Sequence, residues 1–189
     1  MDLATSNDTC KAAFQYAKKH MHPAILNHCI RVYLYAQREY EPSSVPLFVA
    51  CILHDIGSCE VCSGTQRFEV EGADKAVQIM KEFKETEQDC HDVWVAIACH
   101  TCAGIAERIT PLAASVRRAV LVDFGRLDSV DLQVESKYPR LDIEKVLGDA
   151  VVSRCLVSPK TSAPSHTWPG DLYRSHLEDP SNQGVNIAF

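Results

Sequence analysis

The sequence predicts an all-α protein with one helical body and a C-terminal extension. Apolar residues recur at helical spacing over most of the first 157 residues, and Ser, Asn or Pro stands where several of these segments begin. No segment shows the alternation of a convincing strand. A length of 189 residues suits a single domain with one core.

Three helices are expected before residue 58. The first follows the N-cap candidate Asn7 and ends in the cationic residues 18–20. The second opens at Pro23, because proline is favoured in the first turn of a helix. Ser44 caps the third, which runs through a continuous apolar segment until Gly57 provides the C-terminal stop.

Four further helices are expected downstream, from the same spacing of apolar residues. They lie at roughly 70–84, at 93–100, from Pro111 to Phe124 and at 143–151.

Composition changes at the C-terminal end. Four prolines with Ser and Thr predict a long coil, in which Trp168 and Leu172 indicate a short anchored helix. The apolar residues 185–189 are expected to pack back on the body. We therefore predict a helical domain over 1–157 and a coil-rich extension over 158–189 that packs on it.

Composition and charge exclude several classes of protein. The chain is 46% hydrophobic, as a globular protein is, and its formal net charge of −6 without a basic stripe argues against nucleic-acid binding. No apolar run has the length of a membrane span, and the first 20 residues lack the apolar core of a signal peptide. We expect a cytoplasmic protein with a small-molecule partner and no membrane contact. The oligomeric state stays open, with a homo-oligomer among the outcomes.

Nine cysteines are scattered along the chain. An odd count without a secretory signal favours reduced thiols, many of them small core residues. Two pairs, Cys59/Cys62 and Cys99/Cys102, have the spacing of a structural zinc site, which is a rival interpretation. Cys99 follows an apolar run and is more typical of core.

Four helices each place polar residues among apolar ones, where burial of an unpartnered polar group costs free energy. His54 and Asp55 end the apolar run of the third helix, His28 lies on the apolar face of the second, His100 ends the fifth and Asp123 borders the apolar face of the sixth. Each has an ordinary alternative, such as a solvated helix end or a satisfied core histidine. Together they form a mixed nitrogen and oxygen set suited to Zn²⁺, Fe²⁺ or Mn²⁺. Such a metal lowers the pKa of bound water towards neutrality.

The order and context of these residues resemble a known superfamily. His28, then His54-Asp55, then Asp123 match the H…HD…D pattern of HD-domain metalloenzymes. The segments HCIRVYLYA, ILHDIG and RFEVEGA resemble the cyanamide-hydratase-like branch of that superfamily, and the resemblance covers most of residues 20–130. It implies an HD-domain helical bundle with one divalent metal, zinc before iron or manganese. The metal would be held by His28, His54, Asp55 and Asp123.

The sequence departs from the dinuclear members of the superfamily. Those have a histidine before a Gly-Ala on the helix after the HD pair, and residues 67–73 contain none. This argues against a di-iron oxygenase, although Glu69 or Glu71 could substitute. His100 is then free to act as a proton donor or as a substrate-positioning group.

The resemblance implies a hydratase (a lyase) that adds water to a nitrile or cyanamide. His100 would protonate the nitrogen, and Arg31 or Glu71 would orient the substrate. The alternative is a phosphohydrolase acting on a nucleotide or small phosphomonoester, for which Arg31 and Arg67 are the phosphate candidates. Each of these arginines has an equal interpretation as an ion-pair partner of Glu69 or Glu71. A third possibility is a binding module with a structural metal or none.

Overall fold

The computed structural model describes residues 7–38, 40, 44–128 and 131–181. Within these ranges the chain forms eleven α-helices, one short 3-10 helix (η1) and no strand, which confirms the all-α prediction. The elements are α1 (Asp8–His20), α2 (Pro23–Ala36), α3 (Val45–Leu53), η1 (Ile56–Ser58), α4 (Phe68–Glu82), α5 (Glu87–Cys99), α6 (Ala106–Ile109), α7 (Pro111–Asp123), α8 (Leu132–Lys137), α9 (Ile143–Val157), α10 (Pro159–Ser162) and α11 (Trp168–Glu178).

The expected N-terminal signals act as predicted. The side chain of Asn7 accepts a hydrogen bond from the Cys10 N–H, and Pro23 is the first residue of α2. The Ser44 hydroxyl accepts the Leu47 N–H at the start of α3. Side chains that satisfy these free N–H groups are the physical reason for the predicted starts.

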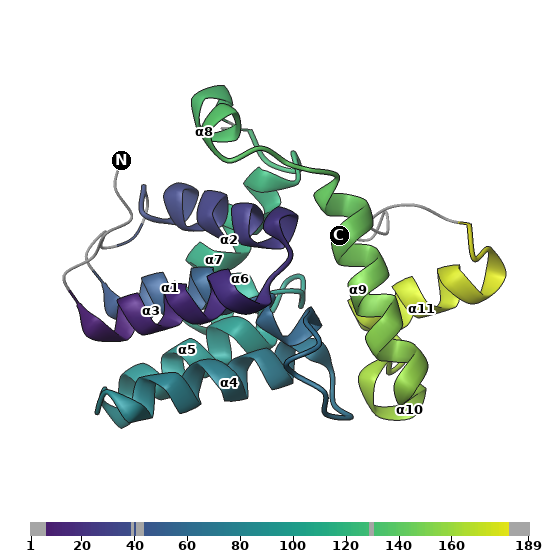
Figure 1. Cartoon of the computed structure of the whole chain (residues 1–189), viewed down its shortest axis with the longest axis horizontal. Coiled ribbons are helices and arrows are strands. Elements are labelled where there is room, and N and C mark those ends of the chain that lie inside the picture. Colours follow the sequence, from purple (N-terminus) through teal and green to yellow (C-terminus); the bar gives the residue numbers. More distant parts are fainter. Residues whose placement is uncertain (1–6, 39, 41–43, 129–130, 182–189) are drawn as a thin grey trace.

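The bundle is built around α3, which contacts α1, α2, α4, α5 and α7 (Figure 1). Every residue from Leu47 to Leu53 is buried. A helix that is apolar on all sides has to be surrounded by others, so the continuous apolar run explains its central place. The two polar residues that follow it, His54 and Asp55, are thereby delivered into the interior.

The sequence predicted that Gly57 ends α3, but the structure contradicts this. The helix ends at Leu53, and Gly57 lies within η1, where α4 packs closely against it. A Cβ atom added to Gly57 would lie 1.8 Å from the carbonyl oxygen of Phe68 and 2.7 Å from the backbone nitrogen of Gly72. Close approach of two backbones is the reason for the glycine, not a helix stop.

The C-terminal region is more helical than the predicted coil. Proline opens α10 and occupies the first turn of α11, where its missing N–H costs nothing. The predicted short helix at Trp168 is α11, and Thr167 caps it. Residues 185–189 lie outside the described residues, so their packing stays a prediction.

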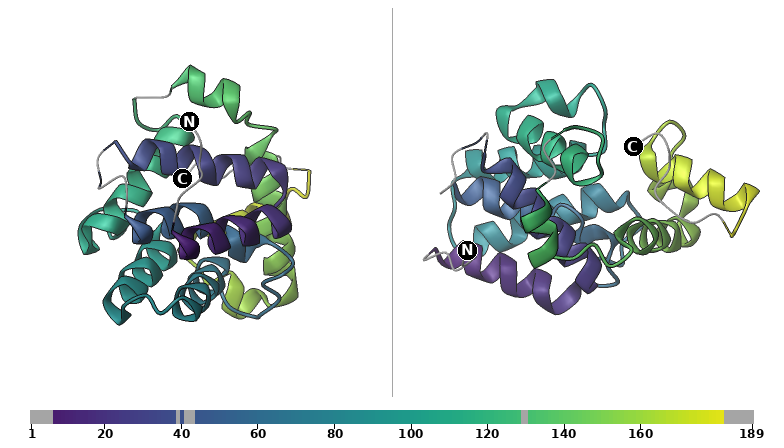
Figure 2. Two further views of the ribbon diagram at one scale, coloured as in Figure 1. Left: turned by 60° about the vertical axis from the view of Figure 1, so that its left-hand side comes forward. Right: turned by 90° about the horizontal axis from the view of Figure 1, so that it is seen from above.

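Helix α9 joins this region to the bundle. It contacts α2 and η1 on one side and α10 and α11 on the other. In Figures 1 and 2 the segment α9–α11 lies at one side of the bundle. The short helices α6 and α8 were not predicted, because four or six residues are too few to show a periodic pattern. No helix in the described ranges combines the length and apolar character needed to cross a bilayer.

Candidate metal centre

His54 and Asp55 stand where α3 ends. His54 is the C-cap residue of α3, and its backbone keeps the helical conformation. Its Nδ1–H donates to the carbonyl oxygen of Cys51 at 2.8 Å. A free carbonyl of the last turn thus accepts the Nδ1–H and holds the imidazole. In the neutral ring the other nitrogen, Nε2, therefore carries no hydrogen. Asp55 is 1% exposed, and its backbone oxygen accepts the hydroxyl of Ser58 at 2.7 Å.

His28 comes from α2 and faces this pair. Its Nε2 lies 3.1 Å from Nε2 of His54 and 3.5 Å from Oδ2 of Asp55. One ligand atom from each of His28, His54 and Asp55 lies within 4.8 Å of the other two. The structure therefore brings three of the four predicted metal-binding residues into one group.

His100 reaches the same place from the end of α5. It repeats the arrangement of His54: it caps its helix, and its Nδ1 donates to the Ile97 carbonyl at 2.7 Å. Its Nε2 lies 3.5 Å from Oδ1 of Asp55. Two histidines at helix C-caps, each bonded to the carbonyl three residues earlier, thus aim at one carboxylate.

The donor atoms of this group fit a divalent cation. His28 and His54 each use Nδ1–H on an acceptor, so in the neutral form each presents a lone pair at Nε2. Oδ2 of Asp55 is buried and accepts no hydrogen bond. Lone pairs and a carboxylate that face one another in a dry interior repel unless a cation or a proton lies between them. Two imidazoles and a carboxylate are ligands that suit Zn²⁺, Fe²⁺ and Mn²⁺.

Asp123 lies next to the group but behind His28. Its Oδ2 accepts the Nδ1–H of His28 at 2.6 Å, on the ring edge opposite Nε2. Both carboxylate oxygens also bind the guanidinium of Arg31, at 2.6 Å from Nε and 2.8 Å from Nη2. The predicted fourth ligand therefore holds the ring of His28, itself a predicted ligand, in this structure.

Arg31 is fully buried and points away from the space between the histidines. Besides Asp123 it donates to the carbonyl oxygen of Tyr138 at 2.9 Å. Arg140 adds a hydrogen bond to the backbone oxygen of Asp123 at 2.7 Å. Arg31 and Arg140 thus both bind Asp123, the last residue of α7. The supporting role of Arg140 was missed from the sequence, because a cation in a polar stretch carries no periodic signal.

Glu71 is not brought to the metal-binding group. Its carboxylate accepts the backbone N–H groups of Gly64 and Gln66 and pairs with Arg154 of α9. These bonds fasten the loop between η1 and α4. Its neighbour Glu69 is buried and binds Arg67 at 2.6 Å and the Thr101 hydroxyl at 2.6 Å.

The two C-x-x-C pairs do not form a metal site. In the described part of the chain the only group of three or more His, Cys, Asp or Glu ligands at metal-binding distances is His28, His54 and Asp55. All nine cysteines are free thiols, and seven of them are buried. The seven buried ones pack as small core residues, whereas Cys99 and Cys102 are half-buried.

Electrostatics make Asp55 anionic and His54 basic. Burial disfavours both charged forms, but the Asp55 carboxylate raises the pKa of His54 well above its ordinary value. The positive charge of His54, with His100 and His28 also facing the carboxylate, holds the pKa of Asp55 well below its ordinary value, against burial. Burial is the dominant influence on His28 and lowers its pKa. A cation and a proton therefore compete for the same place.

Aromatic rings close the group on two sides. The ring of Phe124 lies 4.8 Å from that of His28, and the ring of Phe68 lies 5.7 Å from that of His100. These apolar rings keep the local dielectric constant low, which strengthens the interactions between the charges of the group. The sequence marks both residues only as apolar.

The fold and this donor set define an all-α protein with a buried candidate centre for a divalent metal. The HD domain family model matches residues 25–124, more than half of the 189-residue chain. The chain therefore belongs to the HD-domain family, whose members are generally metal-dependent hydrolases. The matched range contains every residue placed at the centre above. A search of curated proteins found no match.

Proposed function

We propose that the protein is a metal-dependent hydratase that adds water to a small carbon–nitrogen multiple bond, as in a nitrile or cyanamide. One observation carries the choice between this and the phosphohydrolase alternative. Arg31 and Arg67, the arginines considered for phosphate binding, are both neutralised by carboxylates. A phosphate dianion needs free cationic donors, whereas an uncharged substrate needs none.

His28, His54 and Asp55 would hold the metal, with zinc as the first candidate on its ligand preferences and iron or manganese as alternatives. Such an ion, when bound, acidifies water and polarises the substrate. Asp123 and Arg31 fix the ring of His28 so that its Nε2 points inward. The proposal keeps Asp123 as a contributor to metal binding, acting through His28.

His100 is proposed as the proton donor. Its Nδ1–H is used on the Ile97 carbonyl, so an imidazolium carries its second hydrogen at Nε2, which faces Asp55. In the addition, the hydroxyl of water joins the carbon and a proton joins the nitrogen. His100 gives that proton from Nε2 and recovers one from the attacking water, so the reaction is balanced.

The test uses purified, zinc-loaded protein with cyanamide, isonitriles and a panel of nitriles. We expect urea from cyanamide, and we expect His54→Ala to abolish the activity. His91→Ala is the matched control, because His91 is an exposed histidine on α5. No turnover by metal-replete protein on any of these compounds would refute the hydratase. A phosphate-release screen with Mn²⁺, Co²⁺ or Zn²⁺ tests the alternative directly.

A cytoplasmic location stays part of the proposal. Nine free thiols support it, because reduced cysteines persist in a reducing compartment.

A further inference from the structure

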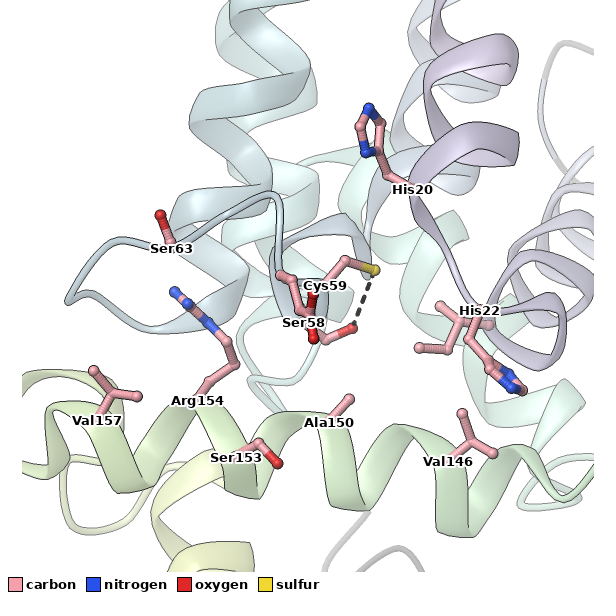
Figure 3. A pocket seen from close by; sticks show the side chains of 12 residues that line it. His20, His22, Ser58, Cys59, Ser63, Val146, Ala150, Ser153, Arg154 and Val157 are labelled. Atoms are coloured by element: carbon pink, nitrogen blue, oxygen red, sulfur yellow. Dashed lines mark hydrogen bonds between the residues drawn. The ribbon is translucent and has the colours of Figure 1, made fainter.

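A cavity of about 600 Å³ opens between three parts of the chain (Figure 3). The junction of α1 and α2 contributes Ile25, the segment after Asp55 contributes Ser58 and Cys59, and α9 contributes Val146 and Ala150. In Figure 3 the side chain of Ala150 projects from α9 towards Ser58 and Cys59, and that of Val146 projects towards His22. We call this cavity the α9 pocket.

Two residues that line the α9 pocket stand close in the chain to the candidate metal centre. Ile25 precedes His28 by three residues on α2, so the two share one face of that helix. Ser58 donates its hydroxyl to the backbone oxygen of Asp55 at 2.7 Å. The residues of the centre are at most 1% exposed and do not line the pocket, so a substrate can reach them only past the residues in between. Ile25 and Ser58 are the lining residues that the chain places nearest to His28 and Asp55.

The lining suits an uncharged ligand with an apolar group. Ile25, Val146 and Ala150 offer an apolar surface, and Ser58 offers a hydroxyl. The one arginine in the lining, Arg154, is bound by Glu71 and by the Gly64 carbonyl. The charge of Arg154 is therefore already balanced by a carboxylate. The lining also contains His20, His22 and Glu60. Small-molecule sites likewise combine apolar surface with polar groups that orient the ligand.

The size of the pocket adds a second argument. Small-molecule sites commonly have volumes of about 300–1,000 Å³, and the α9 pocket falls in this range. Cyanamide has three heavy atoms and would leave nearly all of it unused. The pocket is matched to a substrate that carries a larger group beside its reactive bond.

We propose that the α9 pocket binds the apolar substituent of the substrate, which is an uncharged, substituted cyanamide or nitrile. This rests on the proposed hydratase function and names its substrate class. Ile25, Val146 and Ala150 hold the substituent, while the reactive group points past Ser58 to the metal centre. Ala150 then sets how large the substituent can be.

The test measures both binding and turnover of benzylcyanamide on the zinc-loaded, full-length protein. Ala150→Phe fills the pocket, and Leu156→Phe places the same ring on the exposed side of α9 as the matched control. We expect Ala150→Phe to weaken benzylcyanamide binding by tenfold or more in calorimetry. It should raise KM for benzylcyanamide similarly, while Leu156→Phe leaves the kinetics of both benzylcyanamide and cyanamide unchanged. Val157→Trp at the exposed rim is the second variant, should Ala150→Phe fail to fold.

Binding and turnover separate the two proposals. Benzylcyanamide that binds in an Ala150-dependent way, with no turnover of either benzylcyanamide or cyanamide, supports the pocket and refutes the hydratase. Turnover of cyanamide alone keeps the hydratase and overturns the substituted substrate class. Binding unaffected by both pocket variants overturns the pocket assignment. Phenyl phosphate that binds tighter than benzylcyanamide overturns the uncharged substrate class.

Discussion

Asp123 accepts the Nδ1–H of His28 at 2.6 Å, while the opposite nitrogen of the same ring lies 3.1 Å from Nε2 of His54. One imidazole thus joins a carboxylate on one edge to the metal-binding group on the other. Such outer carboxylates fix the ring, select its tautomer and raise the basicity of the ligating nitrogen. On the proposed function, Asp123 would therefore act on the metal through His28.

Replacing Asp123 by Asn should weaken metal binding without removing the site. Asparagine keeps the shape but loses the charge that supports His28, and such changes reduce metal affinity by about 10–100-fold. The measurement is a zinc titration against a chelator of known affinity. The stoichiometry should stay at about one, because His28, His54 and Asp55 remain. An unchanged affinity would show that the hydrogen bond between Asp123 and His28 is unimportant for the metal.

Arg31→Met should destabilise the fold more than removal of an exposed arginine. Arg31 and Asp123 are both fully buried. Loss of Arg31 removes the two hydrogen bonds of its guanidinium to the buried carboxylate, at a cost of about 3–5 kcal/mol. Arg38→Met on the neighbouring segment is the control, because Arg38 pairs with Asp131 at the surface and should contribute under about 1 kcal/mol. Urea unfolding of both variants gives the comparison. Equal losses would contradict the burial argument.

The sequence predicted the helices because their signals are local. Asn7 and Ser44 cap helices with atoms three residues away, and the apolar run before His54 requires a central helix whatever surrounds it. The gathering of His28, His54 and Asp55 could also be anticipated, since costly polar residues in separate helices need common partners.

Long-range partners could not be predicted in the same way. Arg31 pairs with Asp123, 92 residues away, and Glu71 pairs with Arg154, 83 residues away. Spacing along one helix shows which face a side chain shares, but not which of several opposite charges will meet it. Which edge of the His28 ring faces Asp123 is likewise decided only by how the helices pack.

Zinc affinity should fall as the pH falls, with release of protons on binding. The Asp55 carboxylate raises the pKa of His54 well above 6.5, so a proton has to leave before the metal binds. For chelator-treated protein, the stabilisation from this raised pKa is full below about 6.5 and is lost as the pH rises through the folded-state pKa. Calorimetry in buffers of different ionisation enthalpy should detect about one proton released per zinc at neutral pH. Binding without proton release would contradict the charged state of His54.

Gly57→Ala should destabilise the protein and impair the metal centre together. The new Cβ would lie 1.8 Å from the Phe68 carbonyl oxygen, so α4 must move away from η1, at a cost of about 3 kcal/mol. Asp55 immediately precedes η1, so the same shift should weaken zinc binding. Gly125→Ala is the control: its Cβ would meet nothing within 4 Å, and only its φ of +66° opposes the change, at about 1–2 kcal/mol. Thermal unfolding and zinc titration of both variants measure the two effects. A Gly57→Ala protein as stable as the Gly125→Ala protein would mean that α4 and η1 can separate freely.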